Sequence, residues 1–309
     1  MKTLEFFAGI GGLHAACPWL EVCCAFDIDR DAKEVYQANF GTQYEIRELA
    51  SVKRAELERF EAELWWLSPP CTPFTRKGEQ KDDADPRTEG FLHLMYLATS
   101  LKPRWIAIEN VVGFETSRTA SRVQELLAQS NYVVEVVQKC PSEFGWPNRR
   151  PRIYMLARQS DCSKPEIRWP SSSVVDLRNF IDPKICRENS PHLWIDPMHE
   201  RFLHAMHRVM PFSDSDEINL QEVEGDAYLT ACFGAGYGTS AIRSGSVVWQ
   251  EQGWRRFSPR EVANLLGFTE DFYLPKNLGD RRLWHLLGNS LSLPVVRSLL
   301  SFTNSPKGL

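Results

Sequence analysis

The sequence predicts an α/β fold, a doubly wound parallel sheet that carries a smaller second domain, and three observations support this prediction. In residues 1–157, six short apolar runs alternate with helix-like stretches, the pattern of strand–helix units in a parallel sheet. The first run opens into a glycine-rich turn, a geometry that lets a backbone approach a ligand closely. After residue 158, a stretch rich in Ser, Pro, Asp and Arg indicates a domain boundary near residue 160.

The composition is that of an ordinary globular protein. The chain has 309 residues, of which 43% are hydrophobic and 25% charged, enough for one large core or two modest ones. Its net charge of −4 gives no overall basic footprint for nucleic acid. Any contact with nucleic acid therefore has to come from a local patch.

Several classes of site and protein are not expected. The eight cysteines form no CxxC pair, and the chain shows no signal peptide, which predicts reduced thiols in a cytoplasmic protein. No apolar run approaches the roughly 20 residues of a membrane helix. His199, His204 and His207 lie in one segment without an HExxH motif, so we expect a solvated helix face rather than a metal site.

The first two predicted strands indicate a nucleoside site. The strand at residues 4–7 leads into a turn with three glycines at 9–12, which is shorter than the GxGxxG fingerprint. Such a turn can also serve a purely steric purpose. The second strand, residues 22–26, ends at Asp27, where nucleotide-binding sheets place an acid on the ribose hydroxyls.

Helices are predicted between and after the strands. Asp29 or Asp31 is expected to cap the first long helix. Ser258 and Glu261 form a capping box for a helix that ends at Gly267. The predicted helices are 31–40, 53–62, 89–101, 119–129, 258–267 and 293–302. The last of them is apolar and can return to the first domain.

One cysteine is presented at the edge of the sheet where ligands bind. Residues 64–67 are apolar throughout and predict a buried parallel strand. Pro69, Pro70 and Pro73 cannot extend this strand, so the chain has to turn where the strand ends. Cys71 then lies on a stiff turn at the ligand-binding edge. The alternative is an inert buried thiol.

A glutamate reaches the same edge from the next strand. The strand at 104–108 ends in Glu109 and Asn110, and a carboxylate in apolar surroundings suits acid catalysis. A structural glutamate is the alternative. Residues 75–89 are polar and charged without an apolar period, which predicts a mobile loop beside Cys71, either a plain surface loop or a closing lid.

Two arginines precede the last strand of the first domain. Three further strands are predicted, one ending at residues 48–49, one at 132–138 and one at 153–157. Residues two apart on a strand share a face, so Arg150 and Arg152 can point together. Beside Cys71 and Glu109 they suit a clamp for an anion or a base carbonyl, and a solvated edge is the alternative.

The second domain interleaves aromatic and basic residues. Trp249 and Trp254 lie among Arg243, Arg255 and Arg256. This pattern suits stacking on unpaired bases, and a small core explains it equally well.

Five motifs, in order along the chain, resemble those of the cytosine-5 methyltransferases, and the resemblance covers almost the whole chain. The motifs are Phe7-Ala8-Gly9-Ile10-Gly11-Gly12, Pro69-Pro70-Cys71, Glu109-Asn110-Val111, Arg150-x-Arg152 and Gly288-Asn289-Ser290. The resemblance implies the Rossmann-like fold of S-adenosylmethionine-dependent methyltransferases. It places a catalytic domain at residues 1–160 plus 284–309 and a small target-recognition domain at 161–283.

The resemblance also implies where the cofactor binds. S-adenosylmethionine would lie over the glycine turn, with Asp27 on its ribose, Ile28 against its adenine and Glu48 near the adenine amino group. The implied cofactor-binding residues are Phe7, Ala8, Gly9, Ile10, Gly11, Gly12, Asp27, Ile28, Glu48, Leu49, Pro69, Asn289 and Ser290.

The same family assigns a mechanism to the matched residues. The Cys71 thiolate adds to carbon 6 of cytosine and so activates carbon 5, while Glu109 stabilises or protonates ring nitrogen 3. Arg150 and Arg152 hold the base carbonyl and orient Glu109. The base has to leave its stack, or lie in a single-stranded loop, to reach such a pocket. The implied substrate-binding residues are Arg76, Lys77, Asn110, Cys232, Phe233 and Tyr237.

Within the family, the chain looks most like the subgroup that methylates a cytosine in the tRNA anticodon loop. The sequence around Cys71, Asn148 in place of the usual Gln, and Cys232-Phe233-x-x-Gly236-Tyr237-Gly238 carry this closer match. Thr72 and Gly234 depart from it, since the subgroup usually has Gln and Thr there. The short variable region at 159–256 and the net acidity also favour a folded RNA over duplex DNA.

Two other functions stay open. A DNA enzyme of the restriction–modification type would share every catalytic motif. A cofactor-binding protein that recognises nucleic acid without modifying it would be expected to lose Cys71, Glu109 or the arginines, and all of them are present. The expected partner is therefore tRNA, with DNA as a second possibility, and the protein is expected to be a monomer without a membrane or metal partner.

Overall fold

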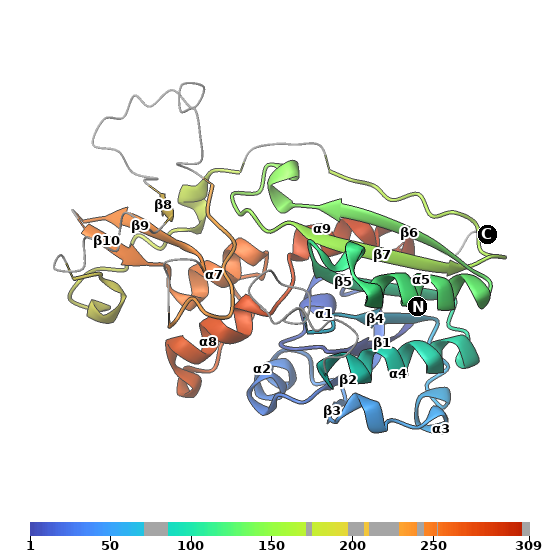
Figure 1. The fold of residues 1–309 in the computed structure, drawn as a ribbon. Helices are drawn as coiled ribbons and strands as arrows, with labels where there is room; N and C mark the ends of the chain where they lie inside the picture. The colour runs from blue at the N-terminus through green and yellow to red at the C-terminus, as the bar shows by residue number, and fades with distance from the viewer. Residues whose placement is uncertain are drawn as a thin grey trace. The chain divides into compact units, whose positions relative to one another are not determined.

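The chain folds into two compact units. The structure, a computed structural model, describes residues 1–70, 86–170, 175–196, 207–209, 229–239, 244–251 and 253–304 (Figure 1). Unit 1 comprises Met1–Lys139, Pro151–Trp169 and Val295–Leu309, and unit 2 comprises Cys140–Arg150 and Pro170–Pro294. The functional domain boundaries expected from the sequence stay a prediction.

Unit 1 is built on a seven-stranded sheet with the order β3-β2-β1-β4-β5-β7-β6 (Figure 1). The strands are β1 (Lys2–Phe6), β2 (Glu21–Asp27), β3 (Tyr44–Ile46), β4 (Leu64–Leu67), β5 (Trp105–Val111), β6 (Tyr132–Lys139) and β7 (Arg152–Gln159). The central strand β4 pairs in parallel with β1 and β5, and all four of its residues are buried. This confirms the buried strand predicted from its unbroken apolar run.

One strand departs from the predicted parallel sheet. β7 runs antiparallel to both of its neighbours, β5 and β6. Residues 140–151, which connect β6 to β7, contain the 3-10 turn Pro141–Phe144 and no crossover helix. Antiparallel neighbours need no crossover, whereas parallel neighbours do. The sheet is therefore mostly parallel, and the α/β class is confirmed.

The helices follow the predicted order with some shifted boundaries. They are α1 (Gly12–Ala16), α2 (Arg30–Phe40), α3 (Arg54–Glu58), α4 (Pro86–Leu101), α5 (Arg118–Gln129), α7 (Pro259–Leu266), α8 (Gly279–Gly288) and α9 (Leu293–Leu299). Asp29 caps α2 by accepting from the Asp31 and Ala32 N–H groups, and Ser258 and Glu261 form the predicted capping box on α7. These capping predictions are confirmed.

Three boundaries predicted from the sequence are wrong. The helix expected at 53–62 ends at Glu58, and the strand segment expected to reach 48–49 ends at Ile46, because Leu49 begins a 3-10 turn. The loop expected at 75–89 gives way to α4 at Pro86, since proline fits the first turn of a helix. Residues 71–85 of that loop lie outside the described residues.

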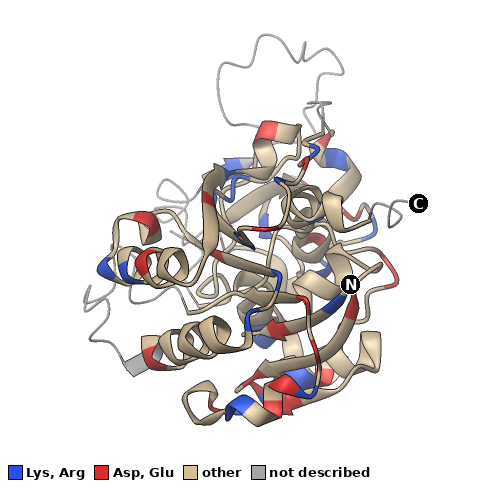
Figure 2. Cartoon of the chain, turned by 90° about the vertical axis from the view of Figure 1, so that its right-hand side faces the viewer, with Lys and Arg blue, Asp and Glu red and all other residues tan. Residues whose placement is uncertain are grey.

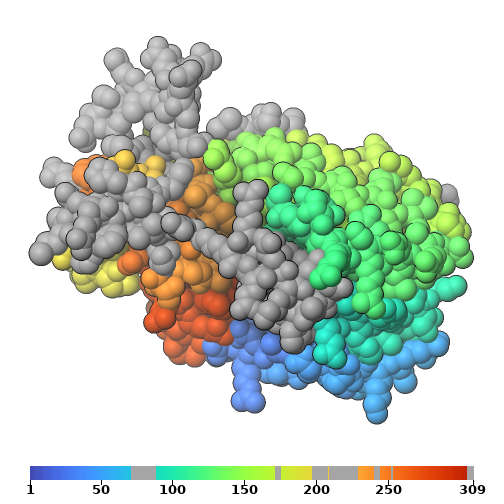
Figure 3. Space-filling view, in the orientation of Figure 1, coloured from blue at the N-terminus to red at the C-terminus, as the bar shows by residue number. Residues whose placement is uncertain are grey.

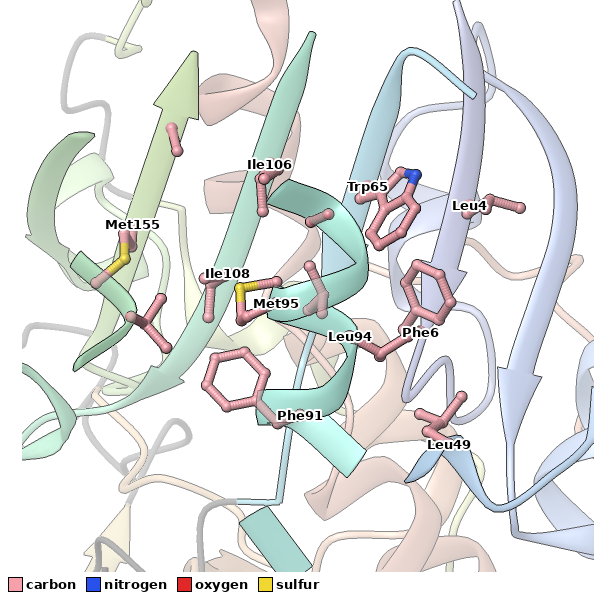
Figure 4. Close-up of a cluster of buried hydrophobic side chains, with 14 of the residues drawn as sticks. Leu4, Phe6, Leu49, Trp65, Phe91, Leu94, Met95, Ile106, Ile108 and Met155 are labelled. Atoms are coloured by element: carbon pink, nitrogen blue, oxygen red, sulfur yellow. The ribbon is translucent and has the colours of Figure 1, made fainter. Parts of the chain in front are cut away.

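The core of unit 1 lies between the sheet and the helices on one of its faces. Figure 4 shows Phe91, Leu94 and Met95 of α4 packed onto side chains from β1, β4, β5 and β7. Leu4 and Phe6 of β1 project onto this face, so the alternation of a strand directs Glu5 to the other face. In Figure 3 the segment from β5 to β7, in green, covers a continuous part of the surface of unit 1.

Unit 2 contains a small sheet of three strands in the order β10-β9-β8. The strands are β8 (His207–Val209), β9 (Ser246–Gln250) and β10 (Gly253–Arg256). Arg255 is fully buried and makes two hydrogen bonds of 2.8 and 2.7 Å to the Glu261 carboxylate. Arg255 therefore belongs to the core, and Trp249 and Trp254 pack edge to face across β9 and β10, 5.1 Å apart.

Metal and membrane features are absent from the described part of the chain. No group of three or more His, Cys, Asp or Glu side chains there could hold a metal ion. None of the helices described combines the length and apolar character that a membrane crossing needs. His207 lies in a strand rather than on the predicted helix face, and His199 and His204 lie outside the described residues.

Basic and acidic residues are intermingled over the described elements in Figure 2.

Glu5 makes the stability of the fold depend on pH. Burial raises the pKa of its carboxyl from 4.5 to about 8, against the opposing effect of hydrogen bonds from Tyr36 and the Leu13 backbone. Between pH 4.5 and about 8 the folded protein keeps a proton that the unfolded chain has released. Raising the pH through this interval therefore favours unfolding.

Replacing Glu5 by glutamine should reduce this dependence, because Glu5→Gln keeps an acceptor for Tyr36 and does not titrate. The loss of unfolding free energy between about pH 5.5 and 8.5, measured by urea denaturation, is expected to be smaller in the variant than in the wild type. Glu21→Gln, at an exposed position of β2, is the control and should keep the wild-type profile. Identical profiles for all three proteins would contradict the expectation.

Candidate active site

Four strands of unit 1 deliver functional side chains to one edge of the sheet. β1, β2, β4 and β5 are parallel, so their carboxyl ends lie together, where ligands bind in open α/β sheets. β1 leads into the glycine turn, and β4 leads into the Pro69-Pro70 turn. Asp27 is the last residue of β2, and Glu109 lies two residues before the end of β5. Cys71, Arg76 and Lys77 follow Pro70 in the chain and lie outside the described residues.

The glycine turn has one closed side and one open side. Phe7, Gly9 and Gly11 all have left-handed backbone angles, with φ of 55, 53 and 87°. A Cβ placed on Gly11 would meet the rings of Phe40 at 2.4 Å and Tyr36 at 2.9 Å, so this glycine is closed off by α2. A Cβ placed on Gly9 would meet no atom of the described residues within 4 Å. The turn thus leaves space at Gly9 for a ligand to approach the backbone.

Asp27 fixes the turn from the neighbouring strand. Its carboxylate accepts the Gly9 N–H at 2.8 Å, and the N–H groups of Ile28 and Asp29 at 2.7 and 3.0 Å. Burial raises the pKa of Asp27, and these three hydrogen bonds act in the opposite direction. The next side chain, Ile28, is 66% exposed, which leaves an apolar surface beside a partly buried acid. This combination suits the ribose and base of a nucleoside.

The other residues expected near a cofactor differ in what they offer. Glu48 is exposed and precedes the 3-10 turn that begins at Leu49. The Leu49 side chain belongs to the core of unit 1, so only its backbone can face a ligand. In unit 2, Asn289 is exposed at the end of α8, and Ser290 is buried.

Glu109 and Arg152 form an ion pair that the register of the sheet dictates. Arg152 is the antiparallel partner of Val111, and Val111 and Glu109 lie on the same face of β5 because they are two residues apart. Arg152 Nε lies 3.2 Å from Glu109 Oε1, and the two side chains are 13% and 10% exposed. A largely buried carboxyl is thereby held in one orientation by a charged partner.

Asn110 holds the turn that leads to Cys71. Its side-chain amide donates to the Pro69 carbonyl at 3.2 Å, and its side-chain oxygen accepts the Val111 N–H at 2.9 Å. Asn110 is 2% exposed. These two hydrogen bonds join β5 to the Pro69-Pro70 turn, and the substrate contact expected for Asn110 stays a prediction.

Arg150 does not share a strand face with Arg152, and that prediction is wrong. β7 begins at Arg152, so Arg150 lies before the strand and belongs to unit 2. Its guanidinium donates to the Phe233 carbonyl at 2.9 Å, to the Gly288 carbonyl at 3.1 Å and to the Ser290 carbonyl. Arg150 thus ties together separate segments of unit 2 through their backbones.

The sequence predicts substrate contacts for Phe233 and Tyr237, but both side chains lie in the core of unit 2. Each is 1% exposed, and together with Phe257 and Trp284 they form edge-to-face ring contacts. The Tyr237 hydroxyl donates to the Ser246 carbonyl at 2.6 Å. Cys232 is partly exposed, with its sulfur 3.5 Å from Arg150 Nη1.

Comparison with known proteins identifies the family. The sequence matches the family of C-5 cytosine-specific DNA methylases over residues 1–302. The chain belongs to this family. The family resemblance inferred from the five motifs is therefore confirmed, and the chain is a cytosine-5 methyltransferase by family.

Individual relatives cover nearly the whole methyltransferase. The tRNA (cytosine(38)-C(5))-methyltransferase of Schizosaccharomyces pombe is 29% identical over 99% of this chain and 97% of its own length. The DNA (cytosine-5)-methyltransferase of Dictyostelium discoideum is 28% identical over 99% of this chain and 95% of its own. The crystal structure of S. pombe Dnmt2 methyltransferase has a TM-score of 0.82 at 28% identity and covers 99% of this chain and 100% of that chain.

Methyltransferases of this family in general use S-adenosylmethionine, and the edge of the sheet in unit 1 fits such a molecule. The open side of Gly9, the partly buried Asp27 carboxylate and the exposed Ile28 provide a backbone surface, a ribose acceptor and an apolar face. Tyr36 and Tyr44, which lie beneath the glycine turn, could not be predicted from the sequence, because no motif connects them with this turn. A tyrosine in a helix or strand is ordinarily a core residue.

Two glycines of unit 2, Gly234 and Gly288, should respond differently to substitution. A Cβ on Gly288 would lie 2.3 Å from the backbone of Gly234 and Ala235, whereas a Cβ on Gly234 would meet only Ser244 Cβ, at 3.9 Å. Gly288→Ala is therefore expected to destabilise the protein by about 1–3 kcal/mol or more. Gly234→Ala is the matched control and should change stability by less than about 0.5 kcal/mol.

Urea denaturation of both glycine variants checks this expectation. The space around Gly234 also suggests that threonine, which is usual in the tRNA subgroup, fits there, so Gly234→Thr should fold normally. A loss of stability of equal size for Gly234→Ala and Gly288→Ala would show that the close approach of the two backbone segments does not matter.

Proposed function

We propose that this methyltransferase transfers a methyl group from S-adenosylmethionine to carbon 5 of a cytosine in the anticodon loop of a tRNA. The observation that carries the proposal is the ion pair of Glu109 and Arg152, which lies at the edge of the sheet where β4 leads into Pro69-Pro70-Cys71. The family match makes cytosine the base and carbon 5 the acceptor. The relatives named as tRNA (cytosine(38)-C(5))-methyltransferases support RNA as the substrate.

Residues of unit 1 would hold the cofactor. The backbone of residues 7–12 approaches it from the open side of Gly9, Asp27 accepts from its ribose hydroxyls, and Ile28 covers one face of its adenine. Glu48 is exposed and suits the adenine amino group, while Leu49 and Pro69 contribute backbone. When bound, S-adenosylmethionine supplies the methyl group that carbon 5 accepts.

Cys71 and Glu109 would share the work on the base. The Cys71 thiolate forms a bond to carbon 6 of cytosine, and the electron pair of the 5,6 double bond moves into the ring. Glu109 donates a proton to ring nitrogen 3, so that no negative charge accumulates there and carbon 5 becomes nucleophilic. Methyl transfer leaves S-adenosylhomocysteine. A water molecule then takes the carbon-5 proton, the 5,6 double bond forms again as Cys71 leaves as a thiolate, and nitrogen 3 returns its proton to Glu109.

The neighbouring side chains would hold these groups in place. Arg152 fixes the orientation of Glu109 and points a guanidinium toward the base carbonyl. Asn110 holds the carbonyl of Pro69, two residues before Cys71. Arg150 would affect the site indirectly, because it fixes the Gly288 and Ser290 carbonyls on either side of Asn289 in the cofactor motif.

The chain would divide these tasks between its two units. We assign cofactor binding and catalysis to unit 1, and target recognition to the part of unit 2 between residues 170 and 283. The net charge of −4 and the intermingled charges in Figure 2 favour a folded RNA, which needs fewer phosphate contacts than duplex DNA. With such a substrate we expect a cytoplasmic protein that acts as a monomer.

DNA is the second candidate substrate, because the relative from Dictyostelium discoideum is named a DNA (cytosine-5)-methyltransferase. Labelled S-adenosylmethionine offered with small RNA and, separately, with genomic DNA from the same host distinguishes the two. We expect label in tRNA, confined to the anticodon loop, and none with Cys71→Ala. Label in DNA at a comparable rate would overturn the choice of RNA, and label in neither would overturn the assigned activity.

Glu109 should affect chemistry rather than cofactor binding. Glu109→Gln keeps the size of the side chain but cannot transfer a proton to ring nitrogen 3, so kcat should fall by about 10²–10⁴-fold. The Kd for S-adenosylhomocysteine, measured by calorimetry, should stay the same. Asp27→Asn is the contrasting variant, because it should weaken cofactor binding and leave kcat at saturating cofactor nearly unchanged. The same pattern for both variants would contradict these roles.

A further inference from the structure

Gly9 is held through both its N–H and its carbonyl, by side chains of β2 and β3. Its N–H donates to Asp27 at the end of β2, at 2.8 Å. Its carbonyl accepts the hydroxyl of Tyr44, the first residue of β3, at 3.2 Å. Tyr44 is 3% exposed and packs edge to face on Tyr36, with ring centroids 5.0 Å apart.

We propose that Tyr44 is a positioning residue for the cofactor, which it serves by fixing the orientation of the peptide between Gly9 and Ile10. This inference rests on the proposed cofactor site. Because a trans peptide directs its C=O and N–H in opposite directions, a Gly9 carbonyl turned toward Tyr44 turns the Ile10 N–H away from the buried side of the turn. An outward N–H in this turn, beside the open side of Gly9, is a hydrogen-bond donor that a carboxylate of the ligand can accept from.

Other hydrogen bonds hold the two ends of the turn, with Asp27 on the Gly9 N–H and the Ala8 carbonyl on the Gly11 N–H, but neither involves the peptide between Gly9 and Ile10. Gly9 adopts a left-handed backbone, with φ of 53°, and no atom of the described residues lies within 4 Å of the place where its side chain would begin. Glycine passes readily between several backbone conformations. The hydroxyl of Tyr44 therefore selects one orientation of a peptide that would otherwise sample more than one.

The neighbouring tyrosine has a different task and provides a matched control. Tyr36 donates its hydroxyl to Glu5 Oε2 at 2.9 Å and receives a contact from His14 Nδ1 at 3.1 Å. Its ring packs under Gly11 rather than Gly9. Removing the hydroxyl of Tyr36 thus disturbs a buried polar cluster but takes no hydrogen bond from the Gly9 carbonyl.

The proposal distinguishes two probes that share an adenosine. S-adenosylhomocysteine carries an amino-acid carboxylate, and 5′-methylthioadenosine lacks it. If Tyr44 aims the Ile10 N–H at that carboxylate, Tyr44→Phe weakens binding of the first probe by roughly 3–10-fold, the effect of one hydrogen bond. Binding of the second probe changes by less than about twofold. The kcat at saturating S-adenosylmethionine stays at the wild-type value.

Calorimetry on the full-length wild type, Tyr44→Phe and Tyr36→Phe tests this expectation. Tyr36→Phe should lower Tm and leave the Kd of both probes within about twofold of wild type. Equal weakening of the two probes in Tyr44→Phe would overturn the proposal, since it would indicate a general loss of structure. Unchanged binding of S-adenosylhomocysteine would overturn it as well. Failure of the wild type itself to bind S-adenosylhomocysteine would overturn the proposed function instead.

Hydrogen exchange provides a second measurement on the protein without ligand. In Tyr44→Phe, the amides of residues 9–12 should exchange faster than in the wild type, while those of β4 and β5 should be unchanged. Faster exchange throughout unit 1 would assign Tyr44 a structural role only and would overturn the positioning role.

Discussion

The site depends on the direction of one strand. β7 runs antiparallel to β5, so its first residue lies at the edge where the parallel strands end. Had β7 been parallel, Arg152 would have begun the strand at the opposite edge, about 23 Å from that position for a strand of this length. The ion pair between Arg152 and Glu109, and with it the orientation of the acid, exists because β7 is reversed.

The parallel strands bring several functional groups together at their carboxyl ends. β1 and β4 lead into a glycine turn and a proline turn with a cysteine after it, and β2 and β5 carry an acid at or near their carboxyl ends. Three of these groups are fixed by side chains of other strands. Asp27 and Tyr44 hold Gly9, Asn110 holds Pro69, and Arg152 holds Glu109. The site is therefore preorganised by pairs of strands rather than by single loops.

Unit 2 uses a buried cation for a comparable purpose. The guanidinium of Arg150 has several donors in one plane and binds backbone carbonyls of segments far apart in sequence. Gly288, whose carbonyl it binds, lies so close to the Gly234 backbone that a side chain would not fit. Arg255 and Glu261 form a second buried pair in the same unit. Arg150 thus holds the loops of unit 2 that carry the family motifs, and the Arg255–Glu261 pair links β10 to α7.

The sequence by itself determined the α/β class, the family and most of the strands, because apolar runs, proline turns and short motifs are local properties of the chain. The cap at Asp29, the capping box at Ser258 and the strand at 64–67 were predictable for this reason. The reversal of β7, the separation of Arg150 from Arg152, and the burial of Phe233 and Tyr237 were decided by tertiary structure. Strand direction and burial depend on partners distant in the sequence, and no local pattern records them. The contact of Tyr44 with Gly9 is of the same kind, since it joins two residues that only the pairing of β1, β2 and β3 brings together.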